Sequence, residues 1–258
     1  MISIILPTYN EAENIGIIIQ ELLNLFKEKS IDCDIIVVDD NSPDGTADVA
    51  GKYSKDNPVK VFVRKSDRGL SKSVIKGFEL AQGDICVVMD ADLSHPVNRI
   101  PEMITPILNN ECDISIGSRY IGEGGWKNLS VIRMTISKIA GFMARGVTDL
   151  SDPTSGFMAV KKSVITGLDL DPMGWKIVLE TAVKAKARII EIPIKFSDRT
   201  RGKSKLGFKA QFEYIQHLLK LYFFRYPIFH KVIKFSLLGF SGLLLICLLW
   251  LSWSKYFS

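Results

Sequence analysis

The stretch Ile85-Cys86-Val87-Val88-Met89-Asp90-Ala91-Asp92 decides the fold of this chain. Five apolar residues in a row predict a strand that is buried on both faces, and such strands belong to parallel sheets covered by helices. The run ends directly in Asp90 and Asp92, and parallel sheets collect their ligands where the strands end. Carboxylate oxygens suit hard divalent cations. We therefore expect both aspartates to hold Mg²⁺ or Mn²⁺; a solvated Asp-rich turn is the alternative.

Outward from this strand, strand and helix patterns alternate. Short apolar runs are followed by segments whose apolar residues recur every three to four positions, which predicts an α/β fold with a mostly parallel sheet and helices on both faces. The predicted strands are Ile2–Leu6, Asp34–Val38, Val59–Val63, Ile85–Met89, Ile114–Gly117, Phe157–Val160 and Ile189–Phe196. The predicted helices are Glu11–Lys29, Asp44–Tyr53, Ser71–Ala81, Pro101–Leu108, Ser130–Arg145 and Trp175–Ala187.

Two further polar clusters follow predicted strands. Pro7-Thr8-Tyr9-Asn10-Glu11 follows the first strand, and Asp39-Asp40-Asn41-Ser42-Pro43-Asp44-Gly45 follows the second. Tyr9 would stack on a nucleotide base and Glu11 would bond to its edge, while a carboxylate of the second cluster would accept hydrogen bonds from a ribose or a base. Both clusters also fit structural roles, as the capped start of a helix and as an ordinary turn.

The basic side chains that are candidates for phosphate binding are Arg119, Arg133, Lys176, Arg199, Arg201, Lys203 and Lys205. A guanidinium fork matches the geometry of a phosphate. The last four lie in a loop between the final predicted strand and the next helix, a position that suits a lid over a phosphate. A solvated basic linker attracted to anionic lipid is the alternative.

The end of the chain has the character of a membrane segment. Apolar residues recur at helical spacing from Phe208 to Arg225, which predicts an amphipathic helix in the membrane interface; a helix packed on the domain is the alternative. The uncharged run Phe235–Trp253 spans roughly 28 Å at ~1.5 Å per residue, close to a bilayer core of ~30 Å. We therefore expect a domain over 1–207, an interfacial helix region over 208–231 and a transmembrane helix over 232–254.

Composition narrows the class of protein. The net charge of +5 is modest and no nucleic-acid module is present, which argues against a nucleic-acid partner. The four cysteines show neither C-x-x-C nor zinc-ligand spacing, so we expect reduced thiols in a domain on the cytoplasmic side of the membrane. The basic flank before the apolar run indicates the same side. The sequence contains no P-loop, no G-x-G-x-x-G after its first strand and no Ser/His/Asp or Cys/His arrangement, and we expect none of the three histidines to be a catalyst.

Together these motifs resemble the family 2 glycosyltransferases with the Rossmann-like GT-A fold, and within them the polyprenyl-phosphate (dolichyl-phosphate) mannose synthases. The resemblance is carried by Leu6–Glu11, Val37–Thr46, Met89–Pro96, Gly117–Tyr120, Asp152–Phe157 and Asp198–Gly207, and it runs from about residue 1 to 227. It implies an inverting transfer of mannose from GDP-mannose to a polyprenyl phosphate at the cytoplasmic membrane face. The acceptor oxygen is already anionic at neutral pH, so this reaction needs no strong general base.

The resemblance also implies roles for individual residues. The nucleotide sugar would be bound by Pro7, Tyr9, Glu11, Val38, Asp40, Asp90, Ala91, Asp92, Lys176, Arg199 and Lys205. Arg119 and Arg133 would hold the lipid phosphate and, with Asp92, would carry catalysis. Asp90, Asp92 and Ser94 would hold the divalent metal. Relatives often have Gln in place of Ser94, and a hydroxyl is a shorter and weaker ligand, so a water would intervene if Ser94 does not reach the metal.

Several alternatives stay open on the sequence. A polyprenyl-phosphate glucose or hexose synthase that uses a UDP-sugar would share these motifs, and a non-catalytic membrane subunit that binds lipid phosphate would share the fold. Longer relatives carry two pairs of transmembrane helices. The one apolar segment here fits a single-span enzyme, a shortened form, or a chain that pairs with another membrane protein or with a second copy of itself.

Overall fold

The computed structural model describes residues 1–127, 131–171, 174, 176–197 and 208–228. The chain divides into two compact units, Met1–His217 and Leu218–Ser258. The first unit contains both sheets and the described helices up to the middle of α8 (Phe208–Arg225). The helix predicted over Phe208–Arg225 has the same bounds in the structure.

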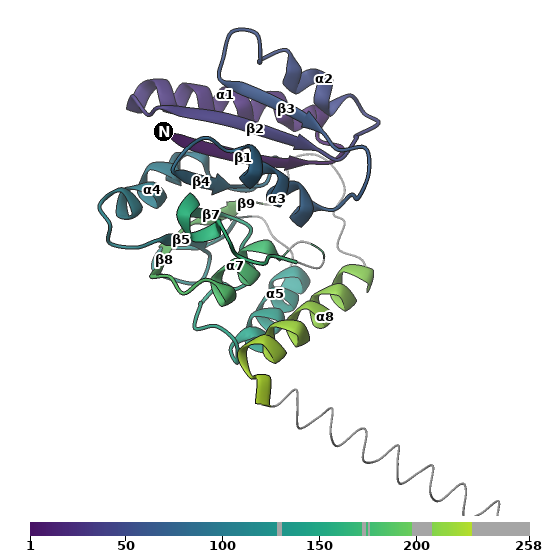
Figure 1. The fold of residues 1–258 in the computed structure, drawn as a ribbon, viewed down its shortest axis with the longest axis vertical. Coiled ribbons are helices and arrows are strands. Elements are labelled where there is room, and N and C mark those ends of the chain that lie inside the picture. Colours follow the sequence, from purple (N-terminus) through teal and green to yellow (C-terminus); the bar gives the residue numbers. More distant parts are fainter. Residues whose placement is uncertain (128–130, 172–173, 175, 198–207, 229–258) are drawn as a thin grey trace, which may run out of the picture. The chain divides into compact units, whose positions relative to one another are not determined.

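A seven-stranded sheet in the order β3-β2-β1-β4-β7-β5-β8 forms the centre of the first unit (Figure 1). Its strands are β1 (Ile2–Thr8), β2 (Cys33–Asp39), β3 (Val59–Val63), β4 (Ile85–Val88), β5 (Ile114–Ser118), β7 (Met158–Lys161) and β8 (Ile189–Pro193). Every neighbouring pair is parallel except the two pairs made by β7, which is antiparallel to β4 and to β5. The expected mostly parallel sheet is confirmed.

The direction of β7 matters for what lies at the edge of the sheet. β1, β2, β4, β5 and β8 all run the same way, so their carboxyl ends share one edge. Because β7 runs against its neighbours, its first residue rather than its last lies at that edge. The turn Asp152–Phe157, which precedes β7, is therefore brought beside the turn that follows β4.

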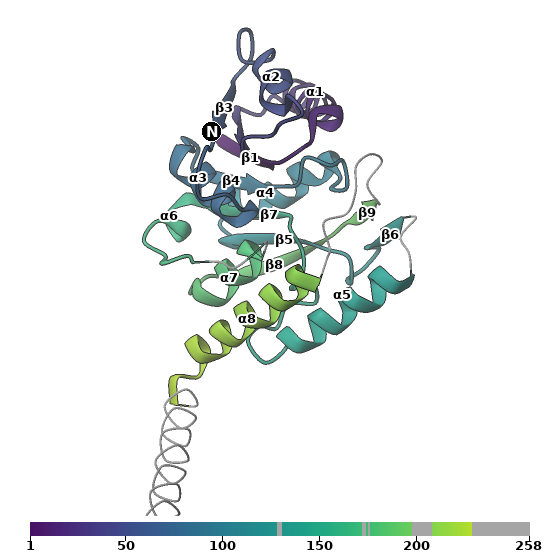
Figure 2. The same cartoon turned by 90° about the vertical axis from the view of Figure 1, so that its right-hand side faces the viewer.

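Helices cover both faces of the sheet because its strands are apolar on both faces. Ile4 and Ile5 are consecutive and both have no exposed surface, yet they belong to different core clusters. The cluster around Ile4 includes residues of α1 (Ala12–Lys29), α2 (Thr46–Gly51) and α4 (Ile100–Leu108). The cluster around Ile5 includes residues of α3 (Leu70–Leu80), α6 (Lys162–Ile165) and α7 (Ile177–Lys184). Figure 2 shows α1 and α4 on one side of the sheet and α3, α6 and α7 on the other.

The strand predicted over Ile189–Phe196 is two strands in the structure. β8 ends at Pro193, and β9 (Lys195–Ser197) leaves the main sheet to pair in parallel with β6 (Gly125–Lys127). A proline lacks the N–H that a continuing strand would donate. The second sheet places Trp126 and Phe196 in edge-to-face contact, with ring centroids 5.6 Å apart.

The remaining helices are the short 3₁₀ helix η1 (Val97–Arg99) and α5 (Val131–Ala144). In the residues that the structure describes, no helix has the length and apolar character needed to cross a bilayer. The predicted transmembrane helix over 232–254 lies outside those residues, and so does the end of the predicted interfacial region after residue 228.

Candidate functional site

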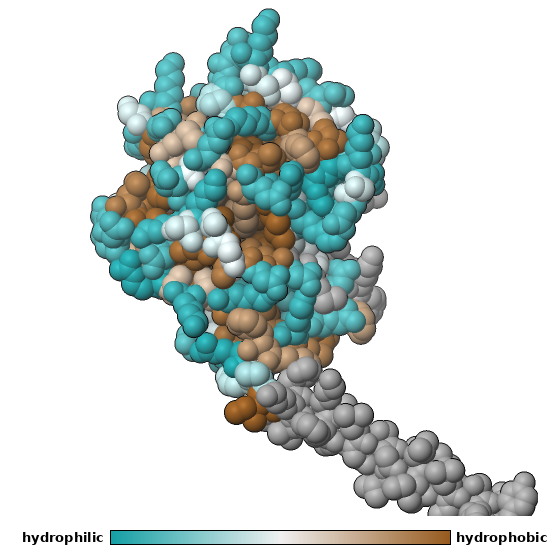
Figure 3. Space-filling model, in the orientation of Figure 1, coloured by the Kyte–Doolittle hydropathy of each residue, from teal (hydrophilic) through white to brown (hydrophobic). Residues whose placement is uncertain are grey.

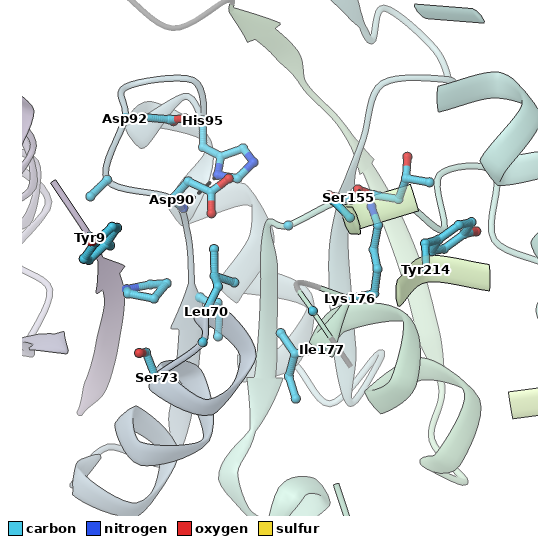
Figure 4. Close-up of a pocket in the computed structure, with 18 of the residues that line it drawn as sticks. Tyr9, Leu70, Ser73, Asp90, Asp92, His95, Ser155, Lys176, Ile177 and Tyr214 are labelled. Atoms are coloured by element: carbon cyan, nitrogen blue, oxygen red, sulfur yellow. Dashed lines mark hydrogen bonds between the residues drawn. The ribbon is translucent and has the colours of Figure 1, made fainter. Parts of the chain in front are cut away.

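A cavity of about 660 Å³ lies at the edge where β1, β2, β4 and β5 end and β7 begins. The predicted site residues that line it are Pro7, Tyr9, Glu11, Asp40, Asp90, Ala91, Asp92, Arg119 and Lys176. Figure 4 shows Tyr9 and Asp90 on one side of this space and Lys176 and Tyr214 on the other. Residues that are far apart in the sequence therefore meet in one cavity, with carboxylates facing cations across it.

Some predicted residues lie elsewhere. Val38 does not line the cavity; it has no exposed surface and packs in the core cluster that includes α3, so its side chain is not available to a nucleotide. Arg199 and Lys205 lie outside the described residues, as does the side chain of Arg133. The roles expected of these three basic residues stay predictions.

Asp90 and Asp92 occupy the turn that follows β4. The turn is made by Leu93, which takes a positive φ of 63°. Asp92 is 3% exposed, and its Oδ1 accepts hydrogen bonds from the backbone N–H of Ser94 (3.1 Å) and from the Ser94 hydroxyl (2.5 Å). Ser94 itself is buried and does not line the cavity. In this arrangement Ser94 orients the carboxylate of Asp92 instead of facing a ligand, which differs from the metal contact expected of it.

His95 has a structural role that the sequence did not indicate. Its Nδ1 accepts a hydrogen bond from the backbone N–H of Asp90 over 3.0 Å, which places the proton of a neutral imidazole on Nε2. The ring stacks on Phe157 with centroids 5.1 Å apart and meets the edge of Phe196. His95 therefore holds the backbone of the Asp90 turn against the start of β7.

The space beside Asp90 fits a small ligand. A Cβ built on Gly156 would lie 3.5 Å from Asp90 Oδ2 and 3.4 Å from His95 Cε1, so the glycine leaves the flank of the carboxylate open. No group of three or more His, Cys, Asp and Glu side chains is placed to hold a metal within the described part of the chain. A pair of carboxylates with water and substrate phosphates is the usual shell of Mg²⁺. Asp90 and Asp92 fit that donor set.

Asp39, the last residue of β2, and Asp40, which follows it, are bound by protein groups. Asp39 has no exposed surface; its Oδ1 accepts hydrogen bonds from the hydroxyls of Thr8 (2.9 Å) and Ser42 (2.6 Å). Asp40 Oδ1 accepts from Arg64 Nη1 (2.8 Å) and from the Ser73 hydroxyl (2.7 Å).

The other oxygen of Asp40, Oδ2, accepts from the backbone N–H of Gly69 over 2.7 Å. Gly69 takes a φ of 148° and precedes α3, and both it and Arg68 line the cavity. Asp40 thus shapes one wall of the cavity through the 68–73 segment. This structural task is additional to the base or ribose contact expected of it.

The start of α1 is held by the loop after β2. Asp44 Oδ2 accepts from the backbone N–H of Ala12 over 3.0 Å, and its Oδ1 accepts from the backbone N–H of Thr46 over 3.1 Å. The helix expected from Asp44 begins instead at Thr46, with Gly45 as its N-cap residue, and the Asp44 carboxylate accepts from the first backbone N–H of both α1 and α2. Burial opposes its charge, but these hydrogen bonds outweigh burial and lower the pKa of Asp44. Glu11, which lines the cavity, accepts from Asn14 Nδ2 over 2.8 Å.

Arg119 is clamped by Asp152. Its Nε donates to Asp152 Oδ2 over 2.6 Å and its Nη2 to Oδ1 over 2.5 Å, while its backbone N–H donates to Oδ2 over 3.0 Å. Nη2 also donates to the Thr154 hydroxyl over 2.6 Å. Burial would raise the pKa of Asp152, but the Arg119 guanidinium outweighs it and holds that pKa below its usual range. The pair is an ionised, buried bidentate pair.

Lys176 brings a buried amine to the opposite wall. It is 2% exposed, and its Nζ donates to the backbone carbonyl of Thr154 over 3.0 Å. Burial, followed by the nearby Arg119 guanidinium, holds the pKa of Lys176 well below its ordinary value. A buried amine of this kind binds an anion strongly because bulk water does not screen its charge.

Sequence reasoning missed several residues of the cavity wall. Trp126 lies with its ring 4.1 Å from the guanidinium carbon of Arg119, and Tyr214 of α8 lies under the Lys176 amine and donates to the Ala140 carbonyl over 2.6 Å. Arg68 also lines the cavity. Tyr214 lies in the segment whose apolar periodicity predicted a helix, and three glycines, Gly122, Gly124 and Gly125, precede Trp126, but neither pattern indicates a binding wall. No sequence pattern marked Arg68.

Comparison with known proteins adds an independent observation. The family model described as "Glycosyl transferase family 2" matches residues 3–167. The chain is 43% identical over 248 residues to a protein of Pyrococcus furiosus named dolichol-phosphate mannosyltransferase, covering 94% of this chain and 69% of that protein. It is 36% identical over 236 residues to a protein of the same name from Saccharomyces cerevisiae, covering 87% and 88%.

Solved structures with the same fold include two glycosyltransferases. Glucosyl-3-phosphoglycerate synthase from Mycobacterium tuberculosis, in complex with Mn²⁺, UDP-glucose and phosphoglyceric acid, matches with a TM-score of 0.64 at 16% identity, over 87% of this chain and 79% of that chain. Mannosyl-3-phosphoglycerate synthase from Rubrobacter xylanophilus matches with a TM-score of 0.62 at 16% identity, over 86% and 74%. At such identity the likeness is one of fold.

Proposed function

The chain belongs to glycosyltransferase family 2 and is a glycosyltransferase, and on this premise we propose that it transfers mannose from GDP-mannose to the phosphate of a polyprenyl lipid. The relatives that cover most of the chain are named dolichol-phosphate mannosyltransferase, which supports the acceptor and the sugar. GDP as the nucleotide is our inference from the motifs of the sequence.

The observation that carries the proposal is the pairing of unlike charges across the cavity. Asp90 and Asp92 lie on one wall and Lys176 lies on the other (Figure 4). Arg119 lines the same cavity, and its Nη2 and the Lys176 amine both donate hydrogen bonds to Thr154. A transfer from a diphosphate to a phosphate brings two anionic groups together, and cations placed around them lower the repulsion between them. The cavity therefore offers what two phosphate-bearing substrates require.

A divalent metal fits the carboxylate wall. Asp90 and Asp92 would hold it, and the open flank that Gly156 leaves beside Asp90 would admit the diphosphate oxygens that complete its shell. When bound, the metal would neutralise the charge that develops on the leaving diphosphate. Ser94 would keep the carboxylate of Asp92 oriented.

In this reaction the main contribution of the protein is to position the two substrates. A phosphate oxygen of the acceptor attacks the anomeric carbon, and the bond from that carbon to the diphosphate oxygen breaks, with inversion. The attacking oxygen is already anionic, so no side chain needs to remove a proton. His95 is not needed as a base and is not placed to act as one, because its Nδ1 already accepts a hydrogen bond from the backbone N–H of Asp90. Arg119 would face the acceptor phosphate and Lys176 the donor diphosphate, which holds the two reactants in line.

We also propose that the protein works at the cytoplasmic face of a membrane. Two helices of the first unit carry exposed apolar side chains: Val131 (71% exposed) and Phe142 (68%) on α5, and Phe212 (61%) on α8. In Figure 3 apolar side chains reach the surface at the level where α5 and α8 lie in Figure 1. These faces and the uncharged run of residues 235–253 support an approach to the lipid acceptor from its own bilayer.

The test is transfer by the purified full-length chain in detergent, with a polyprenyl phosphate and Mg²⁺ or Mn²⁺. We expect a mannosylated lipid from GDP-mannose and little product from UDP-glucose. Product from UDP-glucose alone would replace the donor with a UDP-sugar. Absence of transfer together with absence of nucleotide-diphosphate binding would favour a non-catalytic lipid-phosphate-binding subunit.

A further inference from the structure

We propose that Asp152 is a positioning residue that clamps the guanidinium of Arg119 so that its Nη1 group is presented to the acceptor phosphate. The inference rests on the proposed function, because the acceptor phosphate is the ligand that it assigns to Arg119. It concerns a residue that makes no contact with substrate: Asp152 does not line the cavity and has no exposed surface.

The hydrogen bonds of Arg119 show which part of its side chain is left for a ligand. A guanidinium carries five N–H groups. Nε–H and one N–H of Nη2 go to the two oxygens of Asp152, and the other N–H of Nη2 goes to Thr154. Within the described residues, no hydrogen bond is made by Nη1. Nε and Nη2, which together can bind a phosphate through two hydrogen bonds, are thus occupied by Asp152 and Thr154. The acceptor phosphate would therefore bind at Nη1.

The face of the guanidinium is also held. The Trp126 ring lies 4.1 Å from its central carbon, and Phe196 lies 5.4 Å away. Both aromatic residues come from the small β6–β9 sheet. A planar cation held by two bonds at one edge and by an aromatic ring on its face has few rotamers left. Binding a phosphate then costs little further side-chain entropy.

Hydrogen bonds to Glu191 and Thr154 in turn fix the position of Asp152. Glu191 of β8 accepts hydrogen bonds from the backbone N–H groups of Ser151 (2.8 Å) and Asp152 (2.9 Å). The Thr154 hydroxyl donates to Asp152 Oδ1 over 3.0 Å. Its proton is therefore used, so the contact with Ser137 (3.0 Å) must have Ser137 as the donor. The clamp is a closed network in which each proton has an assigned direction.

The surface of the protein supplies a matched control. Arg188 binds Asp113 with the same three donors, its backbone N–H, Nε and Nη2, each over 3.1 Å. That pair is exposed, since the Arg188 side chain is 58% accessible, and it does not line the cavity. Asp113→Asn therefore removes the same kind of pair without touching the site.

The experiment is a double-mutant cycle with Asp152→Asn and Arg119→Ala, using GDP-mannose and a short polyprenyl phosphate. We expect Asp152→Asn to raise the KM for the lipid about tenfold, because a mobile Arg119 must be ordered again on binding, with little change in the KM for the donor. In the Arg119→Ala background the same substitution should change nothing further, because Asp152 acts only through Arg119. Asp113→Asn should match the wild type.

The inference would be overturned if the increases in lipid KM caused by Asp152→Asn and by Arg119→Ala multiplied in the double variant. It would also be overturned if Asp152→Asn raised the KM for the donor as much as the KM for the lipid. If Asp152→Asn does not fold, Thr154→Val removes the acceptor of Nη2 and is expected to raise the lipid KM in the same selective way; an unchanged lipid KM would also overturn it. Failure of the wild type to use a polyprenyl phosphate would instead refute the proposed function, so the two failures are distinguishable.

Discussion

Replacement of the buried amine, Lys176→Met, should separate stability from activity. Lys176 has almost no exposed surface, and burial disfavours its cation and lowers its pKa; because the lysine is charged in the unfolded chain at neutral pH, burying it opposes folding. Methionine has a similar length and no charge. The variant loses the hydrogen bond to the Thr154 carbonyl but also loses the cost of a buried cation. We therefore expect it to be at least as stable as the wild type.

The same substitution should weaken use of the donor strongly. A hydrogen bond to a charged group contributes about 1.5–3 kcal/mol, and each ~1.4 kcal/mol is tenfold, so kcat/KM for the nucleotide sugar should fall roughly 10- to 150-fold. The control is Lys72→Met. Lys72 also lines the cavity, but it is exposed and pairs with Asp67, and an exposed pair contributes at most about 1 kcal/mol.

The pH dependence follows from the direction of the pKa shift. Burial and the neighbouring Arg119 lower the pKa of Lys176, so its charge is lost as the pH rises through a value well below the ordinary 10.5. A diphosphate needs the charged form. Donor affinity of the wild type should therefore fall as the pH rises through that lowered pKa, whereas the affinity of Lys176→Met should stay flat over the same range.

The assay is donor kinetics at a series of pH values together with thermal unfolding of both variants. A Lys176→Met protein that keeps wild-type kcat/KM would refute the role of the amine in donor binding. If Lys176→Met unfolds at a lower temperature than the wild type and loses activity for that reason alone, the reasoning about the cost of the buried charge is refuted. The Lys72→Met protein shows how much any cation at the cavity contributes.

Other predictions follow from single contacts. Asp92→Ala should abolish transfer while leaving the unfolding temperature nearly unchanged, and near-normal mannosyl transfer would contradict the metal assignment. Ser94→Ala should weaken activation by Mn²⁺ about 10–100-fold, as loss of a group that orients a ligand does, and an unchanged Mn²⁺ titration would contradict that role. Gly77→Ala should destabilise the fold by about 1–3 kcal/mol in a urea titration, because its Cβ would meet Ile5 Cγ2 at 2.3 Å. Gly51→Ala is the control: it lies at the end of α2 with nothing within 4 Å of an added Cβ, and it should not destabilise the fold in the same titration.

Much of the architecture could be predicted because local patterns determine it. Short apolar runs indicate strands and helices repeat every 3.6 residues, so α8 and even the edge strand β3, most of which is not buried, were predicted with the bounds that they have in the structure. The carboxyl ends of parallel strands share an edge whatever the details of packing. Asp40, Asp90 and Asp92 could therefore be assigned to one site from their positions after strands.

The direction of β7 could not be predicted in this way. Apolar runs look the same in either direction, and only the pairing with β4 and β5 shows that β7 is antiparallel. That direction brings the turn before β7, with Asp152 and Thr154, to the site. Sequence reasoning assigned Arg119 to a phosphate but could not give it a partner.

The sequence by itself therefore determined the fold class, the family and the carboxylate edge of the site, because each depends on residues that are close in the chain. Only the tertiary structure decided how the polar groups of that site are used. Asp39 and Asp40 are bonded to protein groups, Ser94 orients Asp92, and Asp152 clamps Arg119. The physical reason is that the energy of a buried polar group depends on its partners, and those partners come from distant parts of the chain.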